Sequence, residues 1–324
     1  MTLTELARLT GTSVATVSKA FSGARDIGED TREKIFAEAK RLGCFEKYYK
    51  GPRERPIIGL IFPEPESEHY GIEIGILERE LSRRGADTVV AITRFDKACE
   101  ARLFSELAYR LKVDGIILSG SGELINNIDE IPFVIISSRK TRIKNADYVN
   151  AGLHSGILRA VSLFKEYGHH EVGFIGEALT VAKLEAFRKA MRQVGLPINE
   201  KYIATSELRF AEAGEDCMKK ILQGGQPPTA ILAAYDQIAF GAMKQARQEG
   251  YRIPEDISFV GMDNISATQF YDVPLTSIHI QMEDICERVV DLIFKRMDNK
   301  HYRERAEIVI PSTVTLRESL CRRK

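Results

Sequence analysis

The chain has 324 residues, and its 46 basic and 46 acidic side chains give no net charge, so overall charge does not point to nucleic acid as a partner. The length predicts two or three domains, and 44% hydrophobic residues are enough for a buried core. The sequence has no apolar run as long as a membrane span, no secretory signal pattern and no Cys-x-x-Cys pair among its five cysteines. We therefore expect a soluble, cytoplasmic protein without disulfides, structural metal or cofactor.

The first forty-odd residues predict three short helices and almost no strand. Thr2 and Glu5 have capping-box spacing at the start of the first helix, and Gly11 is placed to end it. The second helix is expected from Ser13 onward, and the third over 31–42. The short link between the first two helices is typical of a helix-turn-helix, whose second helix enters the major groove of DNA. An ordinary helical hairpin is the alternative.

Residues 44–56 show no periodicity and contain two prolines, so we interpret them as a linker. Beyond them, short β-branched runs alternate with helical segments, which is the pattern of parallel βαβ units. A late helix is expected over 282–297, where the chain can cross between two halves of similar construction. The expected strands are 57–62, 88–92, 115–118, 133–136, 172–175, 202–205, 230–234, 258–262, 277–280 and 308–310.

These elements predict an N-terminal all-α helix-turn-helix domain joined to an α/β body of two doubly wound, parallel-sheet subdomains. The predicted boundaries are 1–46 for the helix-turn-helix domain, 47–56 for the linker or hinge and 57–324 for the body. Within the body, the N-subdomain is expected at about 57–148 plus 281–303, and the C-subdomain at about 149–277 plus 306–324.

Segments spread over nearly the whole chain carry a more specific signal. They are 2–9, 13–19, 21–23, 29–34 and 42–43 near the N-terminus, and 113–117, 167–176, 184–190, 253–263, 274–278 and 316–319 in the body. In their residues, order and spacing, these segments resemble the lactose repressor/galactose repressor (LacI/GalR) family of transcriptional regulators. The resemblance implies a body of the type I periplasmic-binding-protein fold, with a small-molecule effector, a sugar or another metabolite, in the cleft between subdomains. It further implies a homodimer that binds a double-stranded DNA operator.

By this resemblance, the second helix is the DNA-recognition helix. Val14 and Ala15 have no side-chain hydrogen-bond donor, so they could read only shape or a thymine methyl. Lys19 is the expected base donor; the family most often has arginine there, and lysine lacks the rigid planar fork of that side chain. The expected phosphate contacts are Ser13, Thr16, Ser18, Ser22, Thr31 and Arg32. Each of them could instead be a solvated surface residue.

The linker departs from the family pattern. Most members carry a hinge helix whose leucine wedges into the minor groove, and this chain lacks both the Pro-Asn pair and that leucine. Tyr48 or Tyr49 could substitute for the leucine, so kinking of the DNA stays open. Basic linker residues could still contact phosphates: Lys47, Lys50, Arg53 and Arg55.

The resemblance also points to effector-binding positions. Asp263 corresponds to the family's pocket aspartate and could accept hydrogen bonds from ligand hydroxyls or a base. Asp236 begins a helix, where capping is its alternative role. Lys183 and Leu153 stand where most members have an arginine and an Asp-Asn pair, so geometry for a typical sugar is lost. The further lining candidates, in strand-to-helix loops, are Tyr70, Ser119, Ser121, Ser138 and Arg139.

The sequence contains no motif that favours catalysis or metal binding over DNA binding. The His169-His170 pair is the best metal candidate, but adjacent histidines rarely face one ion, so we predict no metal. We predict a homodimeric, sequence-specific regulator, usually a repressor, and not an enzyme; no leucine heptad follows Ser319 to hold a tetramer. Two alternatives stay open. A protein co-regulator could replace the effector, or the protein could bind small molecules without recognising an operator.

Overall fold

The structure is a computed structural model that describes residues 1–24, 26–49, 55–125, 131–137, 143, 146–299 and 304–323. The chain divides into two compact units, Met1–Pro56 and Ile57–Lys324. None of the helices in this described part has the length and the apolar character needed to cross a bilayer.

The N-terminal unit consists of four helices in its described residues. Thr2 caps the first helix through the predicted capping box, and Ser13 caps the second by accepting a hydrogen bond from the Thr16 backbone N–H at 3.0 Å. The three predicted helices are confirmed, and the third begins two residues earlier than expected. The helices are α1 (Leu3–Thr10), α2 (Val14–Phe21), α3 (Glu29–Arg41) and α4 (Phe45–Tyr48).

Helix α4 lies in the stretch predicted as linker, and its aromatic rings belong to the core of the N-terminal unit. The Phe45 ring packs edge-on against Phe36 with centroids 5.1 Å apart, and the Tyr48 ring lies 5.9 Å from Phe21. The Tyr48 hydroxyl donates to the Met1 carbonyl at 2.7 Å. Four residues are too few to show a helical period, which is why the prediction missed this helix. The predicted boundary after residue 46 therefore cuts through a packed element.

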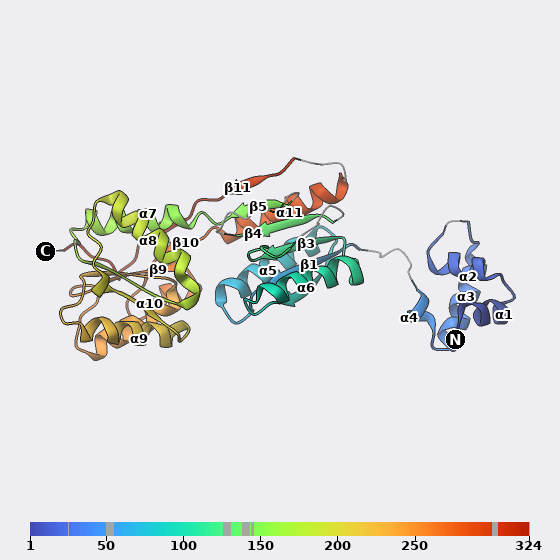
Figure 1. Ribbon diagram of the computed structural model, residues 1–324, viewed down its shortest axis with the longest axis horizontal. Helices are drawn as coiled ribbons and strands as arrows, with labels where there is room; N and C mark the ends of the chain where they lie inside the picture. Colours follow the sequence, from blue (N-terminus) through green and yellow to red (C-terminus); the bar gives the residue numbers. More distant parts are fainter. Residues whose placement is uncertain are drawn as a thin grey trace. The chain divides into compact units, whose positions relative to one another are not determined.

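The described residues of the body form two six-stranded sheets, each with helices on both faces (Figure 1). The first sheet has the order β11-β5-β4-β3-β1-β2, with parallel pairings. We call this sheet and its helices the first lobe. Its strands are β1 (Ile57–Phe62), β2 (Asp87–Ile92), β3 (Gly115–Ser119), β4 (Phe133–Ile136), β5 (Asp147–Asn150) and β11 (Glu307–Val309). Its helices are α5 (Glu68–Arg83), α6 (Lys97–Ser105), the π-helix η1 (Glu106–Leu111) and α11 (Met282–Asp298).

The second sheet has the order β12-β10-β9-β8-β6-β7, and among its described strands only the β10–β12 pairing is antiparallel. We call this sheet and its helices the second lobe. Helices α7 and α8 lie on one face and α9 and α10 on the other (Figure 1). The strands are β6 (Val172–Glu177), β7 (Ile203–Ser206), β8 (Ala230–Ala233), β9 (Ser258–Asp263), β10 (Thr276–His279) and β12 (Thr313–Thr315). The helices are α7 (Leu153–Glu166), η2 (Ala178–Thr180), α8 (Val181–Val194), η3 (Glu200–Tyr202), α9 (Phe210–Gln223), α10 (Asp236–Gln248) and η4 (Ser266–Gln269).

The two doubly wound subdomains are confirmed, and every predicted strand is present within two residues at each end. The prediction missed β5 and β12, which have four and three residues and mix polar with apolar side chains. It also misplaced the late boundary, because β11 pairs with β5 in the first sheet. Residues 307–309 therefore belong to the first lobe, and so do residues 149–150. The described chain crosses between the lobes after β5, after β10 and after β11.

Candidate functional site

The outer face of α2 carries most of the residues predicted to contact DNA. The helix buries Val17, Ala20 and Phe21 against its neighbours. Val14, the first residue of the helix, faces outward and is 42% exposed. The predicted contacts that are exposed on this face and in the following turn are Ser13, Val14, Ala15, Ser18, Lys19 and Ser22; Thr16 and Thr31 are half-buried.

Three of the predicted phosphate contacts also stabilise the ends of α2. The Ser13 hydroxyl lies 2.8 Å from the Thr16 hydroxyl in addition to its capping bond. The Ser22 hydroxyl donates to the Lys19 carbonyl at 3.1 Å in the last turn. These serines therefore have a structural role, and their exposed oxygens leave room for a second partner.

Lys19 and Arg32 are engaged inside the N-terminal unit. Lys19 Nζ donates to Asp26 Oδ2 at 2.5 Å, and this bond holds the pKa of Asp26 below its ordinary value. Both partners are exposed, so the pair is weak and Lys19 can leave it at little cost. Arg32 Nη2 donates to the Ala24 carbonyl at 2.6 Å and is half-buried, so Arg32 holds the loop after α2 in place. Two of the basic linker candidates, Lys50 and Arg53, lie outside the described residues.

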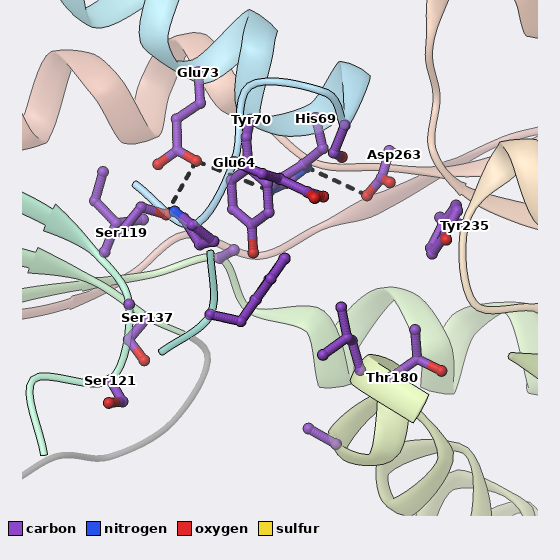
Figure 2. Close-up of a pocket in the computed structure, with 18 of the residues that line it drawn as sticks. Glu64, His69, Tyr70, Glu73, Ser119, Ser121, Ser137, Thr180, Tyr235 and Asp263 are labelled. Atoms are coloured by element: carbon purple, nitrogen blue, oxygen red, sulfur yellow. Dashed lines mark hydrogen bonds and ion pairs between the residues drawn. The ribbon is translucent and has the colours of Figure 1, made fainter. Parts of the chain in front are cut away.

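A cavity of about 400 Å³ lies between the two lobes of the body (Figure 2). It is lined by residues that follow β1, β2, β3 and β4 in the first lobe and by residues at the ends of β6, β8 and β9 in the second. These are the carboxyl ends of parallel strands, where α/β proteins bind ligands. Segments that cross between the lobes also contribute, through Ala151, Leu153, Ile280 and Met282. The volume suits a small molecule.

Four of the predicted effector-binding residues line this cavity: Tyr70, Ser119, Lys183 and Asp263. The further candidate Ser121 and the substituted position Leu153 line it as well. Ser138 and Arg139 lie outside the described residues. The remaining residue, Asp236, does not line the cavity.

Asp236 is instead a buried structural group, so its predicted effector-binding role is wrong. Its carboxylate accepts hydrogen bonds from the Ser277 hydroxyl at 2.6 Å and from the Ile265 N–H at 2.9 Å. A Cβ at Gly261 would lie 2.2 Å from Asp236 Oδ1, so glycine is required for this close approach. Burial, together with the Asp263 charge, raises the Asp236 pKa well above its ordinary value. The alternative role as a helix cap does not apply either, because Asp236 is the first residue inside α10, after the cap residue Tyr235.

Asp263 has the position and environment of a binding group. Its backbone φ of 97° is in the left-handed region, a strained conformation that is concentrated at binding sites. Its Oδ1 lies 3.4 Å from His69 Nδ1 of the first lobe. Burial would raise the Asp263 pKa, but the Lys183 and His69 charges outweigh it and lower the pKa below its ordinary value. Lys183 Nζ itself donates to the Ala234 carbonyl at 2.8 Å.

Arg209 forms an ion pair across the cavity that the prediction missed. Its Nη1 and Nη2 donate to Glu64 of the first lobe at 2.5 and 2.8 Å, and its Nε donates to Glu177 Oε1 of the second lobe at 3.2 Å. The Tyr235 hydroxyl donates to Glu177 Oε2 at 2.7 Å. Each of these residues stands at or just after a strand end, which is the signal that could have identified them.

Glu73, on α5, is the second missed group. Its side chain is 1% exposed and lines the cavity, where Oε2 accepts a hydrogen bond from Ser119 Oγ at 3.3 Å. Burial raises the Glu73 pKa to about 7. His69 Nε2 lies 4.0 Å from Glu73 Oε2. Burial alone would lower the His69 pKa, but the Asp263 and Glu73 carboxylates outweigh it and raise the pKa above its ordinary value.

His169 is a structural histidine. Its Nδ1 lies 3.0 Å from Thr229 Oγ1 and its Nε2 lies 2.9 Å from the Cys321 carbonyl, so both ring nitrogens have partners. Within the described residues, no group of three candidate metal ligands comes together.

Known proteins resemble the chain over nearly its full length. Residues 161–320 match a family described as a periplasmic binding protein-like domain. The chain is 28% identical over 336 residues to the HTH-type transcriptional repressor PurR of Pasteurella multocida (strain Pm70), an alignment that covers 98% of each chain. Two solved structures have the same fold. The lac repressor dimer bound to operator and the anti-inducer ONPF matches with a TM-score of 0.72, 21% identity and 99% of each chain covered. The transcriptional regulator CelR in complex with cellobiose matches with a TM-score of 0.70 and 24% identity, covering 99% of this chain and 100% of its own.

Proposed function

The chain belongs to the LacI/GalR family of transcriptional regulators, and from this premise we propose that it is a sequence-specific DNA-binding repressor in the cytoplasm. It binds a pseudo-palindromic operator as a homodimer, under the control of a small-molecule effector in the cavity between the lobes. Residues 1–49 form the DNA-binding unit, and residues 57–323 form the unit that binds the effector and dimerises.

The observation that carries the DNA-binding role is the outer face of α2. Its side chains are small, from Ser13 through Ala15 to Ser18, so the helix backbone can approach base edges closely. Lys19 ends this face with a long, exposed donor that reaches guanine O6 or N7 after it releases Asp26. Serine hydroxyls at both ends of the helix serve as phosphate contacts that fix the register.

Control by an effector follows from the position of the cavity. Its walls belong to both lobes, so a ligand that touches both walls binds one lobe arrangement more tightly than another. The three segments that cross between the lobes are the places where such a rearrangement bends the chain. Because paired half-sites on DNA lie about one helical turn apart, a small shift in the spacing of two DNA-binding units changes operator affinity.

One alternative function has an observation in its favour. Helix α4 overlaps the start of the segment predicted as the hinge, and Tyr48, a candidate to replace the family's hinge leucine, donates instead to the Met1 carbonyl. A protein that binds small molecules and has lost operator recognition would accommodate this departure. Control by a protein co-regulator is less well supported, because the cavity has the volume of a small-molecule site. An enzymatic role is set aside because the PurR relative is a repressor.

The test is selection of bound sequences from a random DNA duplex library by the full-length protein at two salt concentrations. Phosphate attraction weakens with salt, whereas base recognition persists as sequence preference. The expected result is a two-fold-related motif that is enriched at both concentrations. Binding that is lost with salt and enriches no motif would favour the alternative function.

A further inference from the structure

The described residues that line the cavity carry more acidic than basic side chains. The carboxylates are Glu64, Glu73, Glu100, Glu177 and Asp263, and the basic residues are Lys97, Lys183, Arg209 and His69. The acidic side chains therefore exceed the basic ones even when His69 is charged. A ligand with a phosphate or a carboxylate therefore gains no net attraction from the charges of the cavity.

The basic residues of the cavity are already bonded within the protein. Arg209 holds Glu64 and Glu177, Lys183 donates to a backbone carbonyl, and Lys97 pairs with Glu123. An anionic ligand would have to break one of these bonds to gain a partner, which removes most of the benefit of binding.

Two carboxylate oxygens in the cavity, Glu73 Oε1 and Asp263 Oδ1, are in the opposite situation, because both are buried and neither accepts a hydrogen bond from any described residue. Asp263 Oδ1 does form an ion pair with His69 Nδ1 at 3.4 Å. Glu100, in contrast, is satisfied by the Ser121 hydroxyl and two backbone N–H groups. Glu73 is on the first lobe and Asp263 on the second, and Figure 2 shows the two on either side of His69. A ligand that donates to both oxygens would bridge the lobes.

We propose that the effector is an amine-bearing polyol, an amino sugar or a compound of the same chemistry, whose ammonium group donates to Glu73 while its hydroxyls donate to Asp263. The inference rests on the proposed effector role of this cavity. An ammonium group forms a charge-assisted hydrogen bond and compensates the buried charge of Glu73, which a neutral hydroxyl does not. Hydroxyl side chains that line the cavity can bind the rest of a polyol: Ser119, Ser121, Ser137 and Thr180.

The surroundings of Glu73 support this choice. Without a partner, an ionised Glu73 is costly, and its raised pKa of about 7 reflects that cost. Ser119 supplies one hydrogen bond at 3.3 Å, and His69 at 4.0 Å is beyond hydrogen-bond distance. The site therefore leaves room for a ligand cation that hydrogen-bonds Glu73 directly, which His69 does not do.

The experiment is calorimetric titration of DNA-free, full-length protein near pH 7 with glucose, galactose and mannose, each beside its 2-amino counterpart. We expect at least one amino sugar to bind about tenfold or more tightly than its parent hexose. Glu73→Gln should remove that preference. Glu78→Gln, which changes an exposed carboxylate on the same helix, should retain it.

Several results would overturn the inference: no amino sugar binds, each amino sugar binds no better than its parent, or the preference survives Glu73→Gln. Failure of the proposed function is distinguishable, because calorimetry uses no DNA. An enriched operator without amino-sugar binding overturns the effector class alone. Amino-sugar binding without an enriched operator supports the effector chemistry and overturns the regulatory function.

Discussion

Replacing Arg209 by methionine should destabilise the body of the protein. The change leaves Glu64 and Glu177, which are 5% and 2% exposed, without their shared cation. Removing one partner of a buried ion pair typically costs about 3–5 kcal/mol. Arg209 is 34% exposed and Tyr235 still donates to Glu177, so water and the tyrosine reduce the loss. We expect a decrease of about 2–3 kcal/mol in the free energy of unfolding.

Urea unfolding of the full-length chain, followed by circular dichroism, measures this change. Arg247→Met is the matched control, because Arg247 pairs with Asp272 at 2.8 Å on the surface of the same lobe. The control should lose less than about 1 kcal/mol, as exposed pairs do. Combining Arg209→Met with Glu64→Gln should restore part of the loss, because one uncompensated charge is removed. A loss below about 1 kcal/mol for Arg209→Met, or an equal loss for the control, would refute the buried ion pair as a bond between the lobes.

Three further predictions follow from the DNA-binding face and the buried carboxylates. Lys19→Ala should cost roughly 1–3 kcal/mol of operator-binding free energy and relax the preference at one base position, whereas Asp26→Asn should strengthen binding because it frees Lys19. Competition titrations with operator variants measure both effects. An unchanged base preference in Lys19→Ala would show that Lys19 does not read a base. Asp236→Ala should lower the free energy of unfolding by about 1–3 kcal/mol, because the Ser277 hydroxyl and the Ile265 N–H lose their buried acceptor. Thermal unfolding checks this, and a neutral effect contradicts the structural role. Folded Glu73 has a pKa of about 7 against an ordinary 4.5, so the folded protein retains a proton that the unfolded chain releases between these values. As pH rises through this window, the free energy of unfolding of the wild type should therefore fall relative to that of Glu73→Gln, by at most about 3 kcal/mol. If the two proteins show the same dependence of stability on pH, the Glu73 pKa is ordinary.

The sequence predicted cavity-lining residues that stand directly at strand ends. Asp263 is the last residue of the apolar strand β9, and Ser119 is the last residue of β3. In a parallel sheet these ends meet at one edge, so strand prediction alone brings such residues together. Asp236 stands three residues beyond the end of β8 and turns toward Ser277 instead, a direction that depends on the packing of β10.

Strand ends also mark Arg209 and Glu64 as candidates, but a contact between residues of different lobes could not be predicted in this way. Arg209 and Glu64 are separated by 145 positions along the chain, and neither belongs to a local motif. Their contact depends on how the lobes face each other, which periodicity does not encode. Helix α4 and strands β5 and β12 were missed for another reason: each has at most four residues, too few for a repeat to show.

Symmetric binding of DNA by two copies of the chain is tested most directly by a hydroxyl-radical footprint of the full-length protein on the selected operator, together with the stoichiometry of the complex. We expect two protomers on one duplex, with two protected half-sites related by a two-fold axis and centred about one helical turn apart. Lys19→Ala should weaken protection equally in both half-sites. A single protected half-site, or one protomer per duplex, would contradict the proposed dimeric repressor.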